Sequence, residues 1–343
     1  MSSAARVYQW ERFGDLSGLK LNSVAAPELA ADEVQVRIRA SALNQRDLMV
    51  ARGIAVGSPL RPGLVPLSDG AGEVRAVGSG VSRFKVGDRV AATFRAGCID
   101  SPFQPEQAVD DLGGGRDGVL REFLNADEQD LVLLPAHLSY EEAATLPCAG
   151  VTAWNALFGK RSTGPGDRVL VLGSGGVAVF ALQFAKLAGA QVIATTGDSG
   201  KVARLRSIGA DVVVNYREHP EWEREVLKAT DGRGVDLVVE TGGAGTLPRS
   251  LRATRVGGTV VLVGLQSGVE ADASIFMTTF VRDLNLGAVH VGNRRDFEAM
   301  NRVIGQCKMR PVVDRSFEFA AAAAAYEYLQ AGTHVGKVVI NHG

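Results

Sequence analysis

The first third of the chain alternates apolar and polar residues over short stretches that are typical of half-buried strands. The segment Glu33–Ser41 (EVQVRIRAS) is the clearest of these stretches. The segments Gly70–Val77 and Arg89–Thr93 are two further short strands, and glycine-containing turns at Gly78–Gly80 and Gly87–Asp88 lie between them. Short strands at this spacing predict a small antiparallel barrel or sandwich.

From about residue 150 the pattern changes to short, almost continuous apolar runs. Six such runs alternate with helical patterns: Arg168–Leu172, Gln191–Thr195, Asp211–Asn215, Val235–Glu240, Gly258–Gly264 and Leu286–Val291. Strands that are apolar on both faces and alternate with helices predict a parallel sheet covered on both sides. The chain then returns to a mixed pattern, with helices expected at Phe297–Gln306 and Ala320–Leu329 and a last strand at Lys337–Asn341. We expect this tail to complete the first domain.

The length of 343 residues exceeds the size at which a single hydrophobic core stops growing, so two domains are expected. The predicted division is a discontinuous first domain, residues 1–149 and 292–343, and a second domain, residues 150–291. The formal net charge of −1 gives no indication of nucleic acid or an anionic membrane as a partner. No apolar stretch approaches the roughly 20 residues of a membrane-spanning helix. Three widely spaced cysteines and an N-terminus without an apolar signal core favour a cytoplasmic protein.

The first apolar run of the second domain leads into a glycine-rich loop. The residues from Gly173 to Ala178 (GSGGVA) have the form G-x-G-x-x-A and stand between the strand and a helical pattern, Val179–Leu187. Gly173 permits the tight turn, Gly175 lets the backbone approach a pyrophosphate, and Ala178 allows close packing of helix and strand. The helix N-terminus offers free N–H groups and a positive dipole end to phosphates. The sequence therefore predicts a dinucleotide site at Gly173, Ser174, Gly175, Gly176 and Val177.

The end of the next strand indicates which dinucleotide is preferred. In NAD sites an acidic residue about 20 positions after the first glycine binds the ribose 2′-hydroxyl, but Thr196 occupies this place and Asp198 follows in the turn. Lys201 and Arg204 come next, and a 2′-phosphate needs such cations. We therefore expect NADP(H) in preference to NAD(H). The alternative is that both basic residues belong only to the solvated face of a helix over Ser199–Ile208.

Four segments carry a resemblance to a known family. They are the glycine loop, Glu141–Trp154 (EEAATLPCAGVTAW), Phe84–Val90 (FKVGDRV) and Leu43–Asp47 (LNQRD). Together they make essentially the whole chain resemble the medium-chain dehydrogenase/reductase superfamily, and most closely its zinc-lacking alcohol dehydrogenase-like and quinone oxidoreductase-like branch. The resemblance implies an α/β protein with a GroES-like, β-rich catalytic domain and a Rossmann domain with a doubly wound, parallel six-stranded sheet. It also implies hydride transfer at C4 of a nicotinamide, and homodimers paired through the edges of the Rossmann sheets.

The resemblance also locates the metal positions. Zinc-dependent members have a cysteine where this chain has Asn44 and a histidine followed by glutamate where it has Ser68-Asp69, and a further cysteine ligand corresponds to Cys148. A catalytic zinc ion is held by three thiolate, imidazole or carboxylate ligands, and one thiol with an amide and a hydroxyl is a poor set. The loop of the structural zinc has only Cys98. We expect no zinc at either place, and expect Cys148 to be a small buried apolar side chain near the cofactor. The alternative is that Cys148 is a reactive thiol.

Without a metal, another group must meet the oxygen that gains negative charge during hydride transfer. The resemblance points to Asn44 and Ser68 as hydrogen-bond donors and to Arg46, at the place of a proton-relay hydroxyl in zinc-dependent members, as a fixed cation. Asp47 and Asp69 lie beside them. Asp47 can equally be a structural partner, paired with Arg46, and Asp69 can cap a turn.

The remaining cofactor contacts are expected at Thr152, Thr196, Lys201, Tyr216 and Gly264. Thr152 and its neighbour Trp154 can equally pack only within the core.

Three functions fit these residues. The first is a reductase in which NADPH delivers hydride to a quinone or to an activated alkene such as an enone. The second is a zinc-free alcohol dehydrogenase that interconverts an aldehyde or ketone and an alcohol. The third is a protein that binds NADPH without catalysis. The expected partner is a small-molecule substrate, with neither nucleic acid nor membrane, and the sequence does not identify that substrate.

Overall fold

The computed structural model describes residues 4–55, 59–100, 104, 106, 110–270 and 273–343. Contacts divide the chain into a first unit, Met1–Val151 with Gly292–Gly343, and a second unit, Thr152–Val291. The boundaries expected from the sequence were 149/150 and 291/292. Within the described ranges, no helix is both long enough and apolar enough to cross a membrane.

The second unit contains a parallel six-stranded sheet in the order β10-β9-β8-β11-β12-β13. Its strands are β8 (Arg168–Val171), β9 (Gln191–Thr196), β10 (Val212–Asn215), β11 (Val235–Glu240), β12 (Thr254–Leu262) and β13 (Asn285–Ala288). The predicted sheet is confirmed, although β12 begins and ends earlier than expected and β13 is shorter. The strand order reverses between β8 and β11, and ligands of such sheets bind at the carboxyl ends of the strands beside this reversal.

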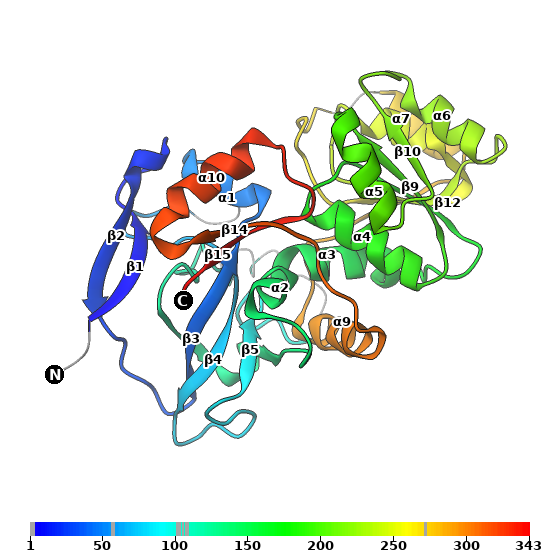
Figure 1. The fold of residues 1–343 in the computed structure, drawn as a ribbon. Helices are drawn as coiled ribbons and strands as arrows, with labels where there is room; N and C mark the ends of the chain where they lie inside the picture. The colour runs from blue at the N-terminus through cyan, green and yellow to red at the C-terminus, as the bar shows by residue number, and fades with distance from the viewer. Residues whose placement is uncertain (1–3, 56–58, 101–103, 105, 107–109, 271–272) are drawn as a thin grey trace. The chain divides into compact units, whose positions relative to one another are not determined.

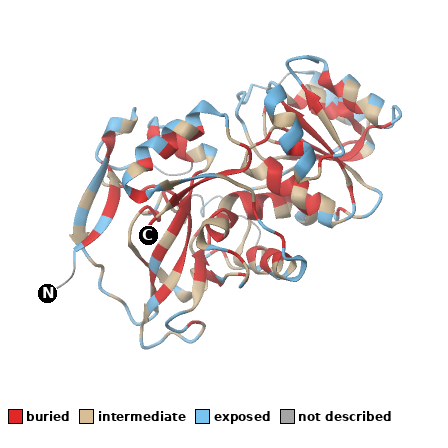
Figure 2. Cartoon of the chain, in the orientation of Figure 1, coloured by how far each residue is buried: buried red, intermediate tan, exposed pale blue. Residues whose placement is uncertain are grey.

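Helices connect these strands (Figure 1). They are α4 (Gly176–Leu187), α5 (Val202–Ile208), α6 (Trp222–Ala229), α7 (Leu247–Ala253) and α8 (Ser274–Val281), and the short helix α3 (Val151–Trp154) precedes β8. All six residues of β11 are buried, because the strand lies inside the sheet and both of its faces are covered. Figure 2 shows buried residues along the strands of this sheet and exposed residues on its helices. This burial explains why the sequence of these strands is nearly continuous in apolar residues and does not alternate.

The first unit contains a seven-stranded sheet in the order β14-β15-β3-β4-β5-β7, with β6 paired to β3, and a separate hairpin of β1 and β2. The strands are β1 (Ala4–Trp10), β2 (Leu19–Ala25), β3 (Glu33–Ala42), β4 (Asp69–Val77), β5 (Arg89–Ala92), β6 (Phe123–Asp127), β7 (Leu131–Leu133), β14 (Val313–Glu318) and β15 (Lys337–Asn341). The last strand, β15, pairs antiparallel with β3. Strands from the two ends of the chain therefore share one sheet.

Four α-helices accompany this sheet: α1 (Gln45–Ala51), α2 (Tyr140–Ala144), α9 (Arg294–Cys307) and α10 (Ala322–Ala331). The core beneath α10 contains Trp10 and Tyr326, whose rings meet edge to face with centroids 5.8 Å apart. The predicted helices at 297–306 and 320–329 are confirmed as α9 and α10, with slightly different ends. The sequence patterns did not predict β1, β2, β6, β7 or β14.

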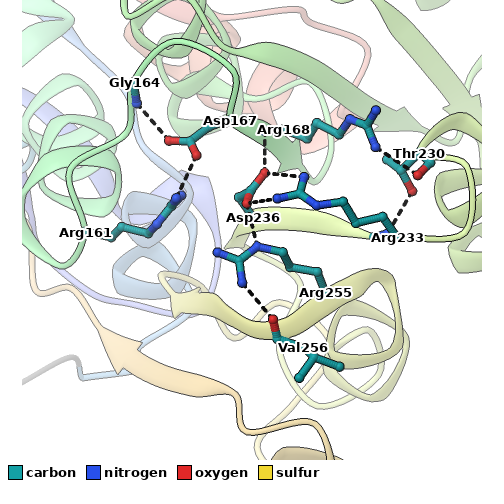
Figure 3. Close-up of polar contacts among 10 residues, drawn as sticks. Arg161, Gly164, Asp167, Arg168, Thr230, Arg233, Asp236, Arg255 and Val256 are labelled. Atoms are coloured by element: carbon teal, nitrogen blue, oxygen red, sulfur yellow. Dashed lines mark hydrogen bonds and ion pairs between the residues drawn. The ribbon is translucent and has the colours of Figure 1, made fainter.

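A buried carboxylate joins the amino ends of three neighbouring strands in the second unit (Figure 3). Asp236 of β11 accepts hydrogen bonds from Arg255 Nε of β12 at 2.6 Å, from the backbone N–H of Arg168 of β8 at 2.9 Å and from Arg233 Nη2 at 2.8 Å. Desolvation alone would raise the pKa of Asp236, but these hydrogen bonds outweigh it and lower the pKa to about 2.

We expect Asp236→Asn to lower the free energy of unfolding of the second unit by about 2 kcal/mol at neutral pH. A carboxyl group whose pKa is lowered by folding stabilises the protein above its unfolded pKa of about 3.9. This contribution is lost as the pH falls towards the folded pKa of about 2. Denaturant unfolding should therefore show a difference in the free energy of unfolding between variant and wild type that shrinks as the medium becomes acidic.

The matched control is Asp231→Asn, because the Asp231 side chain is 90% exposed and 3.6 Å from Arg168, and its effect should stay below about 0.5 kcal/mol. Equal effects of the two variants would contradict the prediction.

Candidate functional site

The glycine loop follows β8 directly and leaves open space for a ligand. Gly173 has a φ of +83°, which favours glycine, and its N–H donates to Thr195 Oγ1 at 3.1 Å on the neighbouring strand. A Cβ built at Gly175 would meet no atom within 4 Å. Because α4 begins at Gly176, its first N–H groups have no acceptor within the helix. The loop therefore has the geometry that a pyrophosphate requires.

The turn after β9 uses its polar side chains internally. The Thr196 hydroxyl is buried and lies 3.2 Å from the Asp198 backbone N–H, which donates to it, and 3.3 Å from the Asp198 carbonyl. Asp198 Oδ1 accepts from the Gly200 N–H at 2.9 Å, which caps the short helix Ser199–Lys201. The one carboxylate at this strand end thus stabilises the start of a helix.

Three of the predicted cofactor residues gather at the carboxyl ends of β8, β9 and β10. Lys201 Nζ lies 3.3 Å from Ser174 Oγ, so an ammonium group stands beside the glycine loop. Tyr216 follows β10 and packs against Gly197, where a Cβ would lie 2.4 Å from the tyrosine hydroxyl. Tyr216 remains 43% exposed, which leaves part of the side chain open to a ligand.

A buried glutamate that the sequence analysis missed organises the loop after β11. Glu240 Oε1 accepts from the N–H groups of Gly242 and Gly243, at 2.7 and 3.1 Å, and from the Thr246 hydroxyl at 2.7 Å. Its other oxygen accepts from the Ser250 hydroxyl. The signal in the sequence was an acid at the end of an apolar strand, followed by two glycines. Glu240 thereby fixes the chain beside the glycine loop, since β11 is the neighbour of β8.

Of the three remaining predicted cofactor residues, Val177 lies in the first turn of α4, and Gly264 and Thr152 lie in tightly packed parts of the chain. Gly264 follows β12, and a Cβ there would lie 2.3 Å from the Thr241 carbonyl oxygen, so close approach of two chain segments requires glycine. Thr152 is buried in α3. Its neighbour Trp154 packs against the rings of Phe158 and Phe184, with centroids 4.5 and 5.7 Å apart, which agrees with the core alternative for the tryptophan.

In the first unit, a buried lysine lies among the residues at the positions of the zinc ligands in zinc-dependent members. Lys337, the first residue of β15, is 3% exposed. Its ammonium donates to the Leu43 carbonyl at 2.7 Å, to Asn44 Oδ1 at 2.6 Å and to Asp69 Oδ2 at 3.3 Å. The second oxygen of Asp69 accepts from the Ser68 hydroxyl at 2.7 Å. The sequence analysis assigned Lys337 only to a strand. The missed signal was a lone lysine opening an apolar strand.

Asn44 is fixed at the start of α1. Its backbone N–H donates to Asp47 Oδ2 at 2.7 Å, so Asp47 is a structural partner, as one alternative held, but of Asn44 instead of Arg46. Burial raises the pKa of Asp47 to about 6, against the opposing charge of Arg46. The side-chain Nδ2 of Asn44 is buried and has no hydrogen-bond partner among the described residues. An unsatisfied buried donor typically costs about 1–3 kcal/mol, which makes Nδ2 the polar atom of this cluster that most needs an acceptor.

Arg46 is held within the first unit. Its guanidinium is paired with the Asp111 carboxylate, donates to the Leu112 carbonyl at 2.9 Å and lies 4.9 Å from the centre of the Phe94 ring. The side chain is 11% exposed. Its charge is therefore already balanced by a neighbouring acid.

Cys148 lies near the same cluster as a neutral thiol. Burial raises its pKa to about 12, and the negative charge of Asp69 acts in the same direction. The described part of the chain contains no group of three or more His, Cys, Asp or Glu residues placed to hold a metal ion.

Comparison with known proteins gives a consistent family. The model of the alcohol dehydrogenase GroES-like domain matches residues 30–136, and the model named zinc-binding dehydrogenase matches residues 176–306. A zinc-type alcohol dehydrogenase-like protein of Schizosaccharomyces pombe is 38% identical over 98% of this chain and 99% of its own. The 2-methylene-furan-3-one reductase of Solanum lycopersicum is 32% identical, over 99% of this chain and 79% of its own.

Two further relatives extend the comparison to another activity and to structure. A chloroplast envelope quinone oxidoreductase homolog of Arabidopsis thaliana is 30% identical over 95% of both chains. A solved NAD-dependent alcohol dehydrogenase matches with a TM-score of 0.89 and 34% identity, over 98% of this chain and all of its own. Sequence identity of this extent over the full length, with both domain models in place, shows that the chain is an oxidoreductase belonging to the medium-chain dehydrogenase/reductase family.

Proposed function

We propose that this chain is a zinc-independent, NADP(H)-dependent reductase that transfers hydride to a quinone or to an activated alkene such as an enone. The observation that carries the proposal is the environment of Asn44. Its amide oxygen accepts a hydrogen bond from Lys337, and its buried Nδ2 lacks an acceptor among the described residues. The expected cytoplasmic location stays a prediction.

The donor set supports zinc independence. Asn44 Oδ1 and the Ser68 hydroxyl already bond to Lys337 and Asp69, which leaves Cys148 as the one thiol among the three positions. A catalytic zinc ion is held by three thiolate, imidazole or carboxylate ligands, and neither an amide nor a hydroxyl belongs to that set. A lysine ammonium beside two of the three positions would also repel a dication. These residues therefore do not fit a zinc ion.

The absence of a zinc set favours acceptors that need little activation. An alcohol gives up hydride readily only when its oxygen is ionised and the charge is stabilised, which is the role of a metal in zinc-dependent enzymes. A quinone or an enone is already electron-poor, and hydride addition moves charge onto an oxygen that one amide donor can stabilise. The names of two relatives, a quinone oxidoreductase homolog and a reductase of a methylene furanone, support this choice.

The residues of the chain would divide the work as follows. NADPH supplies the hydride, and the glycine loop with the N-terminus of α4 binds its pyrophosphate. Asn44 donates from Nδ2 to the acceptor oxygen as its charge grows. The Ser68 hydroxyl donates a hydrogen bond to Asp69, and Arg46 pairs with Asp111. Of the three residues expected to be catalytic, Asn44 is therefore the one we assign to the oxygen. Arg46 would act by shaping the surroundings together with Phe94.

We expect the purified protein, treated with a zinc chelator, to oxidise NADPH in the presence of enones or quinones at the rate of the untreated protein. Aldehydes, ketones and secondary alcohols should give little or no turnover. Asn44→Ala should lower kcat about 100-fold, the usual cost of removing one donor to a developing oxyanion, with the Kd for NADPH unchanged.

The matched control for this variant is Asn22→Ala, on the separate hairpin of β1 and β2, where the amide bonds to Gln9. It should keep wild-type kcat. Loss of activity on chelation with recovery on adding zinc would overturn zinc independence. Turnover of alcohols but not of enones or quinones would favour the alcohol dehydrogenase alternative, and NADPH binding without any turnover would favour the non-catalytic one.

The preference for NADP(H) is also a proposal, and it rests on charge. Lys201 stands beside Ser174, and Asp198, the acid that follows β9, uses Oδ1 to cap the short helix Ser199–Lys201. A 2′-phosphate would gain a charge-assisted hydrogen bond from the ammonium, whereas a ribose diol has no free carboxylate at Thr196 to bind. One solved relative is named as NAD-dependent, so this proposal rests on the chain's own residues and not on its relatives.

We expect Lys201→Ala to raise the Kd for NADPH about tenfold or more and to leave the Kd for NADH unchanged within about twofold, because a hydrogen bond to a charged group contributes about 1.5–3 kcal/mol. Titration of intrinsic or nicotinamide fluorescence measures both constants. Lys228→Ala is the control, since Lys228 is 81% exposed on α6. Equal losses for the two cofactors would contradict the assignment of Lys201 to the 2′-phosphate.

We further propose that two chains pair through the β13 edge of the six-stranded sheet. β13 lies at one end of that sheet, with Leu286 40% exposed. The preceding helix, α8, leaves Phe276 and Phe280 stacked and exposed at 73% and 75%. An open strand edge beside exposed aromatic side chains favours a self-complementary contact with a second copy.

We expect the wild-type protein to have twice the chain mass of 36.1 kDa in light scattering after size exclusion. Phe276→Lys with Phe280→Lys should reduce the mass to that of one chain, because two buried charges at the contact oppose pairing. The control is Val86→Lys, at an exposed apolar position of the first unit. A wild-type monomer, or a double variant that still dimerises, would overturn this contact.

A further inference from the structure

We propose that Lys337 is a positioning residue, which holds the Asn44 amide in the one orientation that presents its Nδ2 protons to the substrate. The inference rests on the proposed function in one respect, the role of Asn44 as donor to the substrate oxygen. It adds Lys337, which lies on the last strand, β15, outside the segments that contain the candidate catalytic residues.

The argument begins with the hydrogen-bond capacity of the ammonium. A lysine ammonium has three N–H donors and no acceptor. All three directions are used in this structure, towards the Leu43 carbonyl at 2.7 Å, Asn44 Oδ1 at 2.6 Å and Asp69 Oδ2 at 3.3 Å. Because an ammonium cannot accept, the atom of the Asn44 amide that faces it must be the oxygen.

This constraint also determines the direction of Nδ2, the other polar atom of the Asn44 amide. With Oδ1 bound to Lys337, Nδ2 lies on the opposite side of the amide, where it is buried without a partner among the described residues. Rotation by half a turn would put an NH₂ group against the ammonium and an oxygen towards the substrate, and both contacts would be repulsive. Lys337 therefore removes the orientation in which Asn44 would oppose charge on a substrate oxygen.

Asp69 keeps the ammonium in this place. It is 0% exposed, and its two oxygens accept from Lys337 and from the Ser68 hydroxyl. The backbone of Asn44 is fixed independently by the bond from its N–H to Asp47 Oδ2 at 2.7 Å. Both ends of the contact are thus anchored, and the amide orientation is set before any substrate binds.

The test separates positioning of Asn44 from a purely structural role for Lys337. Lys337→Met alone would leave the buried Asp69 carboxylate without a cation and can fail to fold. The informative pair is therefore Asp69→Asn and the double variant Lys337→Met with Asp69→Asn. Relative to Asp69→Asn, the double variant should fold with a similar thermal midpoint, bind NADPH with the same Kd and lose about 10- to 100-fold in kcat towards the best enone or quinone.

A double-mutant cycle with Asn44→Ala provides the deciding comparison. If Lys337 acts through the amide, then adding Lys337→Met to a protein with Asp69→Asn and Asn44→Ala should change kcat by less than about twofold. A further 10- to 100-fold loss in that background would mean that Lys337 acts by another route. An unchanged kcat in the presence of Asn44 would also overturn the proposal.

A second readout needs no turnover. In protein labelled with ¹⁵N-asparagine, the side-chain NH₂ signals of Asn44 are identified by their loss in Asn44→Ala. They should be sharp in Asp69→Asn and shifted or broadened after Lys337→Met is added. Unaltered signals would overturn the positioning role even if the enzyme reduces none of the proposed acceptors, so failure of this inference is distinguishable from failure of the proposed function.

Discussion

The ion pair of Lys337 and Asp69 is the interaction on which the first unit depends. Burying an ammonium costs several kcal/mol unless its charge and all its hydrogen bonds are matched, and breaking a buried pair typically costs about 3–5 kcal/mol. Here the match requires three chain segments to meet: the start of β15, the residues before α1 and the start of β4. The antiparallel register of β15 with β3, in which Val339 lies opposite Ala42, delivers Lys337 to this point. The pairing of β15 with β3 therefore also brings the polar cluster together.

The second unit has one buried carboxylate at each edge of its parallel sheet, and the two have different partners. At the amino edge, Asp236 is neutralised by arginines on neighbouring strands and serves the fold (Figure 3). At the carboxyl edge, Glu240 is satisfied by backbone N–H groups and hydroxyls and supports a loop. The glycine loop beside it retains free N–H groups at the start of α4, which is where a phosphate can still bind. The carboxylate that is paired with arginines thus lies at the edge of the sheet opposite the glycine loop.

The sequence predicted those elements whose residues follow a local pattern. Strands covered on both faces must be apolar throughout, so six runs of such residues indicated the parallel sheet, and the glycine loop indicated its ligand end. β1 and β2 were missed because they form a hairpin at the margin of the first unit, and β14 because its partner is β15, the last strand. Lys337 and Asn44 are 293 positions apart. A contact of that sequence separation leaves no periodic signal, so resemblance could supply Asn44 but no pattern could supply its partner.

In the proposed site the positive charge of Lys337 does not touch the reacting oxygen, because the amide of Asn44 lies between them. A zinc ion would withdraw electrons from that oxygen directly, whereas the ammonium acts on the far side of an amide. A hydrogen bond to Oδ1 polarises the amide and makes its Nδ2 protons better donors, since hydrogen bonds in series strengthen one another. The gain is modest compared with coordination to a metal, and it is available only to an acceptor whose oxygen needs modest help. The chemistry that such a site selects is therefore set as much by the buried lysine as by the asparagine that would touch the substrate, and it favours electron-poor acceptors over alcohols.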